Sequence, residues 1–341
     1  MEHLVEEKEL TFRDFETDQD VRWCPGCGDY AILKAVQKVM PQIGKEKEDI
    51  VFISGIGCSS RFPYYMNTYG FHTIHGRAPA VATGVKLANP NLSVWQVTGD
   101  GDALAIGGNH YIHALRRNID INILLFNNEI YGLTKGQFSP TSATGLKTKS
   151  SPQGTVDRSF NPGKLAVGAE ANFFARVIDV DPKRMAEVML MAEKHIGTSL
   201  VEILQNCIIF NDKVFANVTG KDVKLDMQLW LAHGEPMIFG KEKNKGIVLN
   251  GLQLEIVTIG ENGVTEADIL VHDAHCSSNI LHNMLISMSA PEFPVAFGVI
   301  RQVASESFDQ NVWKQIEEVK KTAKIKSVDE LMNSGVTWEI E

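Results

Sequence analysis

The chain has 341 residues, of which 44% are hydrophobic and 22% charged, a composition typical of one large or two modest globular domains. Its net charge of −9 is spread along the chain, and no basic stripe could follow a phosphodiester backbone, so we expect no nucleic acid partner. The N-terminus is acidic and no stretch of 18 uncharged apolar residues occurs, so we expect a cytoplasmic protein without a membrane partner.

Helical and strand patterns alternate through most of the chain and predict an α/β fold with a doubly wound, mostly parallel sheet. A long irregular stretch dense in Gly, Ser, Thr and Pro interrupts the pattern at 131–165 and is typical of a binding loop. The predicted elements are helices over 29–39, 78–87, 103–117 and 182–195, and strands over 50–54, 93–98, 121–126, 173–180 and 199–206.

The character of the chain changes after Cys207 to polar turns, and we expect a smaller C-terminal extension there. A lysine-rich patch lies at 241–245, an isolated strand is predicted over 254–259, and an amphipathic helix is predicted near 313–323. The predicted domains are therefore residues 1–210, which contain the α/β pattern and all motifs described below, and residues 211–341, an extension that we expect to form a subunit interface.

Two polar motifs directly follow predicted strands. Gly99-Asp100-Gly101-Asp102 comes after one strand, and Asn127-Asn128 comes after the next. Ligands bind at the carboxyl edge of open α/β sheets, and the glycine turn would point free amides at an anion. The side chains of Asp100 and Asn128, with the Ile130 carbonyl, are hard oxygen donors that suit Mg²⁺ bridging to a diphosphate. Each motif alone is usually just a turn, but together they predict a thiamine diphosphate site. A nicotinamide site is disfavoured because no Gly-x-Gly-x-x-Gly follows a first strand.

The five cysteines are not expected to form a disulfide framework in a chain without a secretion signal. Cys24 and Cys27 form a CxxC turn, whereas Cys58 and Cys207 follow predicted strands. Strand ends share one edge of a sheet, so the four thiolates can converge on a [4Fe–4S] cluster or on a Cys₄ zinc ion. One CxxC pair with two scattered cysteines favours the cluster, and a redox dithiol would leave two of the four unexplained. Cys276 is interpreted as a buried packing residue.

These motifs resemble the β subunit of 2-oxoacid:ferredoxin oxidoreductases, most closely the 2-oxoglutarate type, over most of residues 20–210. The resemblance implies a thiamine-diphosphate-binding fold and a [4Fe–4S] cluster bound by Cys24, Cys27, Cys58 and Cys207. It also implies Mg²⁺ ligands at Asp100, Asn128 and the Ile130 carbonyl. The residues that it places around the cofactor are Ile56, Gly57, Cys58, Ser59, His75, Gly101, Asp102, Gly132 and Leu133. The motifs that carry it are Trp23-Cys24-Pro25-Gly26-Cys27-Gly28, Gly55 to Arg61, His75-Gly76-Arg77, Gly99 to Asp102 and Asn127 to Gln137.

The implied reaction is the coenzyme A-dependent oxidative decarboxylation of 2-oxoglutarate to succinyl-CoA and CO₂, reversible in principle, with ferredoxin as electron acceptor. Arg61 can contact a carboxylate through two parallel hydrogen bonds, and Lys135 could reach a second carboxylate or a coenzyme A phosphate. Pyruvate-specific relatives tend to carry glycine at the position of Lys135, which favours the dicarboxylate. His75 could assist proton transfer. Each residue also has an alternative interpretation. Arg61 could form a structural ion pair, Lys135 could be a solvated loop lysine, and His75 could be a structural histidine.

One group that thiamine enzymes use is missing: the glutamate that protonates the aminopyrimidine, supplied from a second thiamine-type domain. We find no such second domain in the sequence, so the resemblance implies an obligatory α subunit. Three alternatives remain open on the sequence: a pyruvate or broad-range oxidoreductase, a non-redox thiamine diphosphate lyase subunit, and a non-catalytic chain with a structural zinc site.

Overall fold

The computed structural model of the protein describes residues 9–336 together with 338 and 340. Residues 1–8 belong to the acidic N-terminus on which the expected cytoplasmic location partly depends, and they lie outside the described residues. The strands in the described part are β1 (Ile50–Ser54), β2 (Tyr69–His72), β3 (Ser93–Gly99), β4 (Asn122–Asn127), β5 (Phe173–Ile178), β6 (Ser199–Leu204), β7 (Gln228–Leu231), β8 (Ile238–Phe239), β9 (Lys245–Asn250), β10 (Gln253–Thr258) and β11 (Val295–Gln302).

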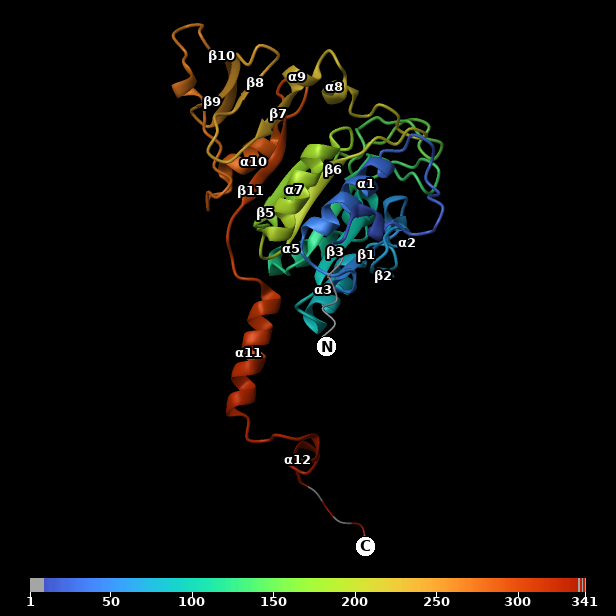
Figure 1. The fold of residues 1–341 in the computed structure, drawn as a ribbon. Helices are drawn as coiled ribbons and strands as arrows, with labels where there is room; N and C mark the ends of the chain where they lie inside the picture. Colours follow the sequence, from blue (N-terminus) through green and yellow to red (C-terminus); the bar gives the residue numbers. More distant parts are fainter. Residues whose placement is uncertain (1–8, 337, 339, 341) are drawn as a thin grey trace, which may run out of the picture.

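These strands form an eight-stranded main sheet, in the order β2-β1-β3-β4-β6-β5-β11-β7, and a small sheet, in the order β10-β9-β8 (Figure 1). Neighbouring strands from β2 to β5 are parallel, β11 runs antiparallel to β5, and β7 runs parallel to β11. The predicted α/β class with a mostly parallel sheet is therefore confirmed. The carboxyl ends of β1, β3, β4, β5 and β6 all lie at the same edge, which is where the polar motifs follow.

Helices cover both faces of the main sheet, as a doubly wound fold requires. The helices in the described part are α1 (Asp29–Val39), α2 (Phe62–Tyr65), α3 (Ala78–Ala88), α4 (Asp100–Leu104), α5 (Gly108–Arg117), α6 (Pro162–Gly168), α7 (Pro182–Lys194), α8 (Ala216–Thr219), α9 (Lys224–Met227), α10 (Ile280–Ser287), α11 (Phe308–Thr322) and α12 (Val328–Met332). None of them is long and apolar enough to cross a membrane.

Alternate residues of the buried strands supply two separate hydrophobic cores. In β1, Val51 and Ile53 pack in one core with residues of α3 and α5, whereas Ile50 and Phe52 pack in the other with residues of α1 and α7. This alternation follows from the two-residue period of a strand, and burial of both faces explains the near-continuous apolar sequence of β1 and β4.

Two predicted elements differ from the structure in how they are divided or paired. The crossover helix predicted over 103–117 is two helices. The first, α4, begins at Asp100, and the helical conformation is interrupted before α5 begins. Gly107 permits the break: a Cβ there would lie 2.4 Å from the Asp102 carbonyl oxygen. The strand predicted as isolated over 254–259 corresponds to β10, which pairs antiparallel with β9.

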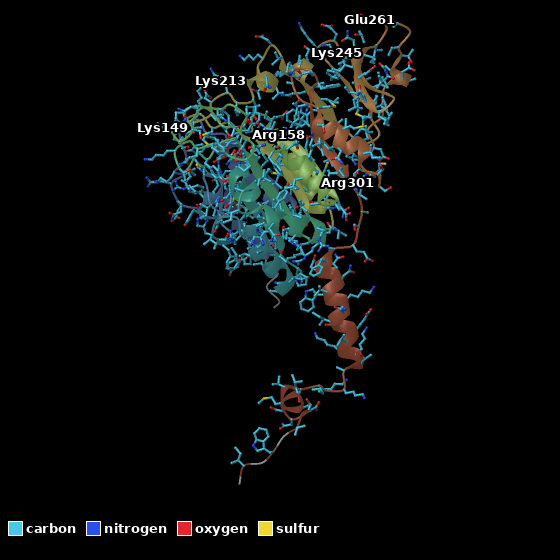
Figure 2. The ribbon with its side chains drawn as sticks, turned by 180° about the vertical axis from the view of Figure 1, so that it is seen from behind. Lys149, Arg158, Lys213, Lys245, Glu261 and Arg301 are labelled. Carbon is cyan, nitrogen blue, oxygen red and sulfur yellow. The ribbon has the colours of Figure 1, made fainter. Side chains whose placement is uncertain are left out.

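The C-terminal extension contributes to the main sheet through β7 and β11, which the sequence analysis did not predict. The boundary at residue 210 and the interface role of the extension stay predictions. The lysine-rich patch leads into β9 on the outlying small sheet, where Lys245 lies away from the loops that carry Lys149 and Lys213 (Figure 2).

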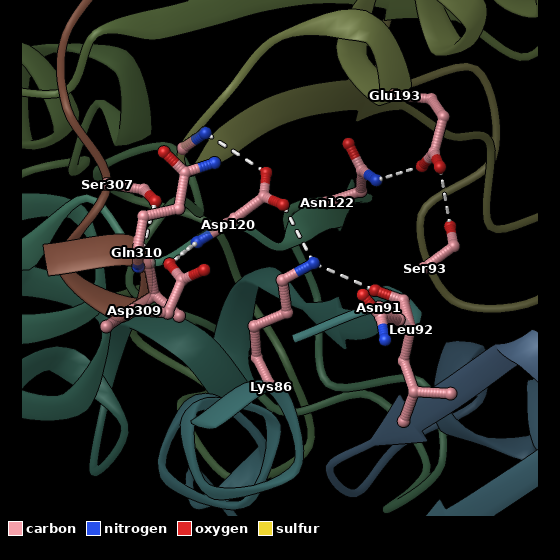
Figure 3. Close-up of polar contacts among 12 residues, drawn as sticks. Lys86, Asn91, Leu92, Ser93, Asp120, Asn122, Glu193, Ser307, Asp309 and Gln310 are labelled. Atoms are coloured by element: carbon pink, nitrogen blue, oxygen red, sulfur yellow. Dashed lines mark hydrogen bonds and ion pairs between the residues drawn. The ribbon is translucent and has the colours of Figure 1, made fainter. Parts of the chain in front are cut away.

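The helix predicted near 313–323 begins earlier, at Phe308, because Ser307 caps it by accepting a hydrogen bond from the backbone N–H of Gln310. Its first turn is fixed to the body of the protein: Asp309 Oδ1 accepts from the backbone N–H of Asp120 at 3.0 Å, and the Asp120 carboxylate pairs with Lys86 Nζ at 2.8 Å (Figure 3). From this anchored base, α11 and α12 extend away from the rest of the molecule (Figure 1).

Candidate active site

A pocket of about 200 Å³ lies at the carboxyl edge of the main sheet, between the loops that follow β1, β3 and β4. It brings together every residue predicted to surround the cofactor and every predicted Mg²⁺ ligand. The residues concerned are Ile56, Gly57, Cys58, Ser59, His75, Asp100, Gly101, Asp102, Asn128, Ile130, Gly132 and Leu133. We call this space the cofactor pocket.

The predicted metal ligands come from the ends of two adjacent strands. Asp100 follows β3 and is 2% exposed, and its Oδ2 accepts hydrogen bonds from Ser139 Oγ at 2.6 Å and Thr141 Oγ1 at 2.5 Å. Asn128 follows β4, donates from Nδ2 to Gln205 and accepts on Oδ1 from the backbone N–H of Ile130. The turn between Asn128 and Ile130 is made by a left-handed residue at position 129, with φ of 55°.

The electrostatics of the cofactor pocket fit a bound cation. Burial raises the pKa of Asp100 to about 6 and that of Asp29, which also lines the pocket, to about 7. No lysine or arginine of the described residues lines this pocket. A divalent cation would supply the missing positive charge, and carboxylate, amide and carbonyl oxygens are the donors that Mg²⁺ prefers. Ser59 Oγ, also in the pocket lining, is buried with no hydrogen-bond partner in the described chain, which leaves it available to a ligand.

Two glycines of the motifs are required by close approach. A Cβ on Gly101 would lie 2.2 Å from the ring of Tyr131, whose hydroxyl donates to the Gly101 carbonyl at 2.9 Å. A Cβ on Gly55 would lie 1.8 Å from Asp102 Oδ2. The sequence analysis did not single out Tyr131, which the structure places in the pocket lining; an aromatic residue three positions after the metal asparagine was the available signal.

Asp102 mainly forms hydrogen bonds with other residues of the protein. Its buried carboxylate accepts from the backbone N–H of Ile56 at 3.1 Å, the backbone N–H of Gly76 at 2.8 Å and Thr98 Oγ1 at 2.7 Å. His75 Nδ1 lies 2.8 Å from Asp102 Oδ1. The carboxylate therefore joins two loops that line the cofactor pocket, and the His75 ring lies against it without a well-aligned hydrogen bond from Nδ1.

A second pocket, of about 210 Å³, is lined by all four predicted cluster ligands, and we call it the cysteine pocket. Gly26, with φ of +85°, lets the chain turn between Cys24 and Cys27, and the Cys27 N–H donates to the Cys24 carbonyl at 3.0 Å. Cys58 lies in the loop after β1, and Cys207 lies in the loop after β6. All five cysteines are free thiols, and Cys276 is not part of the pocket lining.

The four thiols line one pocket. Among the described residues, no group of three or more His, Cys, Asp or Glu side chains is drawn together closely enough to hold one metal ion. Burial, the charge of Asp29 and the neighbouring thiols together raise the pKa of Cys27, and the same causes raise that of Cys58 to about 12. Arg61, which also lines this pocket, is a nearby cation whose charge acts to lower the pKa of Cys58.

The two pockets are neighbours and share part of their lining: Asp29, Cys58, Asn128, Gly132 and Leu133. At Gly132, an added Cβ would lie 3.5 Å from Cys58 Sγ and 3.6 Å from Cys207 Sγ. Because Gly132 has no side chain, little protein separates the two pockets at this point. Groups bound in the two pockets would therefore lie close together.

Arg61 and Lys135 line the cysteine pocket and not the cofactor pocket. Arg61 donates from Nη1 to the Arg22 carbonyl at 3.3 Å, and the exposed Lys135 has a left-handed backbone with φ of 72°. Of the three residues predicted to act on substrate, only His75 lines the cofactor pocket. Substrate contact by all three residues stays a prediction.

Comparison with known proteins gives three findings. Residues 55–203 match the family model described as "Thiamine pyrophosphate enzyme, C-terminal TPP binding domain". The 2-oxoglutarate oxidoreductase subunit KorB of Mycobacterium tuberculosis is 48% identical over 96% of this chain and 88% of its own length. The 2-oxoglutarate synthase subunit KorB of Archaeoglobus fulgidus is 46% identical over 54% of this chain and 69% of its own length.

A solved structure is also similar: the 2-oxoglutarate:ferredoxin oxidoreductase from Magnetococcus marinus with 2-oxoglutarate, coenzyme A and succinyl-CoA bound. The match has a TM-score of 0.75 and 29% sequence identity, and it covers 97% of each chain. The fold and the family expected from the motifs are thus confirmed. The chain belongs to the family of β subunits of the 2-oxoacid:ferredoxin oxidoreductases.

Proposed function

We propose that this chain is the β subunit of an enzyme that converts 2-oxoglutarate and coenzyme A to succinyl-CoA and CO₂ and transfers the electrons to ferredoxin. The observation that carries the proposal is the contact between the cofactor pocket and the cysteine pocket across Gly132. A decarboxylating oxidoreductase needs an electron acceptor beside its thiamine site, whereas a lyase needs the thiamine site alone. The names of the two KorB relatives and the molecules bound in the Magnetococcus structure support 2-oxoglutarate as the substrate.

The cofactor pocket holds thiamine diphosphate and Mg²⁺ in this proposal. Asp100, the Asn128 amide oxygen and the Ile130 carbonyl bind the metal, and Ser59 donates to the cofactor from a hydroxyl that lacks another partner. When bound, thiamine diphosphate supplies an electron sink for the carbanion left by decarboxylation. His75, which lies against Asp102 and lines the pocket, orients or protonates the substrate.

The cysteine pocket holds a [4Fe–4S] cluster, which supplies a one-electron acceptor between the cofactor and ferredoxin. Cys24, Cys27, Cys58 and Cys207 are its ligands. Trp23, buried beside them, donates from Nε1 to the Cys58 carbonyl at 2.7 Å and fixes that loop.

The cations at the rim of the cysteine pocket attract the anionic substrates. Arg61 and Lys135 line the cysteine pocket, as does the predicted metal ligand Asn128. From there Arg61 binds a carboxylate of the 2-oxoacid, and Lys135 binds the distal carboxylate of 2-oxoglutarate or a phosphate of coenzyme A.

An α subunit completes the site. Apolar side chains on the loops around the cofactor pocket are exposed, with Ile74 at 69%, Ile106 at 56% and Leu133 at 50%. Exposed apolar groups beside a ligand pocket are typical of a protein interface. The partner covers them and supplies the glutamate that faces the cofactor. The assembled enzyme acts in the cytoplasm.

Cysteine substitution in the complex of this chain with its α subunit separates this proposal from the lyase and zinc alternatives. Cys24→Ser should remove the brown colour and the bound iron and abolish electron transfer from 2-oxoglutarate to a viologen dye. Cys276→Ser, outside both pockets, is the matched control and should keep iron and activity. A Cys24→Ser complex that still decarboxylates 2-oxoglutarate at the wild-type rate would favour the lyase, and zinc at one per chain without iron would favour the structural zinc site.

A further inference from the structure

A buried loop lies behind the predicted metal site, on the side of Asp100 away from the cofactor pocket. Ser139, Thr141 and Ser142 are each no more than 3% exposed, although they belong to the long irregular stretch. Ser139 and Thr141 both donate to Asp100 Oδ2, and Ser142 Oγ donates to the carbonyl of Glu129, the residue between Asn128 and Ile130. The loop therefore contacts both strand ends that supply metal ligands.

Thr141 also connects the carboxylate of Asp100 to the interior of the sheet. Its Oγ1 lies 3.0 Å from Asn127 Oδ1, and Asn127 Nδ2 donates to Glu202 Oε1 at 2.8 Å. The other oxygen of Glu202 pairs with Arg176 Nε at 2.8 Å, and both side chains of this pair are almost fully buried, at 2% and 6% exposure. Arg176 and Glu202 are direct neighbours on β5 and β6.

Thr141 has one hydroxyl proton for two acceptors, Asp100 Oδ2 at 2.5 Å and Asn127 Oδ1 at 3.0 Å, and the shorter contact favours donation to Asp100. Because Asn127 uses its Nδ2 on an acceptor-only carboxylate, its Oδ1 must face Thr141. The two hydroxyls of the loop both occupy Oδ2 of Asp100, so Oδ1 is the oxygen of that carboxylate without a hydroxyl partner among the described residues. A buried ion pair is costly to maintain and adds little stability by itself. Its place at the end of this chain of contacts indicates a role in orientation.

We propose that Thr141 is a positioning residue for the metal site, supported from behind by Asn127, Glu202 and Arg176. It fixes the rotation of the Asp100 carboxylate so that one oxygen is turned toward the metal. The inference rests on the proposed function, because it assumes that Asp100 binds Mg²⁺ with thiamine diphosphate. Groups that orient a metal ligand through a hydrogen bond typically contribute about 10–100-fold to metal affinity or activity.

Three variants of the complex with the α subunit test this role. Thr141→Val keeps the shape of the side chain and removes the hydroxyl, whereas Thr141→Ser keeps the hydroxyl. Thr198→Val is the matched control: Thr198 is also fully buried, its Oγ1 donates to the Ile119 carbonyl at 2.7 Å, and it lies beside the amino end of β6, at the opposite edge of the sheet. Ser139→Ala removes the other hydroxyl that donates to Asp100, and it provides a second test if the Thr141→Val complex does not assemble.

The measurement is the dissociation constant of Mn²⁺, used as an EPR-visible substitute for Mg²⁺, in the metal-free complex with thiamine diphosphate present. We expect Thr141→Val and Ser139→Ala to weaken Mn²⁺ binding about tenfold or more and to alter the spectrum of the bound ion. Thr141→Ser should bind as the wild type does. Thr198→Val should lower the unfolding temperature without changing Mn²⁺ affinity.

Wild-type affinity in the Thr141→Val complex, or an equal loss in Thr198→Val, would overturn the positioning role while the proposed function stands. A wild-type complex that binds neither Mn²⁺ nor thiamine diphosphate would overturn both.

Discussion

The imidazole of His75 lies against the buried carboxylate of Asp102, with Nδ1 2.8 Å from Oδ1. The ring itself is 39% exposed, and His75 lines the cofactor pocket. The pair therefore brings a residue from a loop at the pocket edge against the motif that also contains a metal ligand.

This relationship predicts different consequences for the two residues. His75→Gln should lower kcat and leave the free energy of unfolding nearly unchanged, because the ring is partly exposed. Asp102→Asn should lower kcat as well and should also destabilise the chain by about 1–3 kcal/mol, because the amide removes the anionic acceptor that two backbone N–H groups and the Thr98 hydroxyl now share. Urea denaturation and dye-reduction kinetics measure the two effects. Equal stability of the two variants would contradict the structural role of Asp102.

A second prediction concerns the glycine between the two aspartates of the motif. Gly101→Ala should displace the Tyr131 ring, weaken thiamine diphosphate binding and cost about 1–3 kcal/mol of stability through overpacking. Gly108→Ala, at the first residue of α5, is the control, because a Cβ there would meet nothing within 4 Å, and it should leave both unchanged or raise stability slightly. Calorimetric titration measures the affinity of each variant for the cofactor, and thermal unfolding measures its stability. Tight cofactor binding by Gly101→Ala would contradict the close packing described here.

A third prediction concerns pH and the C-terminal extension. Burial lowers the pKa of His282 below its ordinary value of 6.5, and the neighbouring Arg301 guanidinium, 3.0 Å from Nδ1, lowers it further. The unfolded chain therefore binds this proton more readily than the folded chain. The stability that neutral His282 provides is complete above pH 6.5 and is lost as the pH falls below it toward the folded-state pKa.

The test compares the wild type with His282→Gln, so that titrations common to both chains cancel. The difference in unfolding free energy should shrink as the pH is lowered from about 7.5 to about 5. A difference that stays constant, or grows toward acid pH, would show that His282 is not held neutral in the folded chain.

The sequence was most informative where chemistry depends on strand ends. Cys58 and Cys207 are far apart in the chain, yet each lies within four residues of the end of a buried strand of one parallel sheet, so their convergence with Cys24 and Cys27 could be predicted. The same reasoning placed Asp100 beside Asn128. These predictions depend only on parallel strands ending at a common edge, and they did not need accurate loops.

The supporting residues could not be found in this way. Ser139 and Thr141 belong to a loop without hydrophobic periodicity, and only the three-dimensional path of that loop brings them to Asp100. Strand β2 is exposed along its length and β7 has four residues, so neither shows a clear buried pattern. The apolar run of β11 was a usable signal that was missed, because it lies in a region interpreted as polar turns.

The most direct test of the central claim is electron transfer by the intact enzyme. The chain would be co-purified anaerobically with its α subunit, and reduction of a viologen dye would be followed with 2-oxoglutarate and with pyruvate, each with and without coenzyme A. We predict coenzyme A-dependent reduction that is fastest with 2-oxoglutarate. Faster reduction with pyruvate would contradict the assigned substrate, and no reduction with either from a brown, thiamine-loaded complex would contradict the proposed reaction.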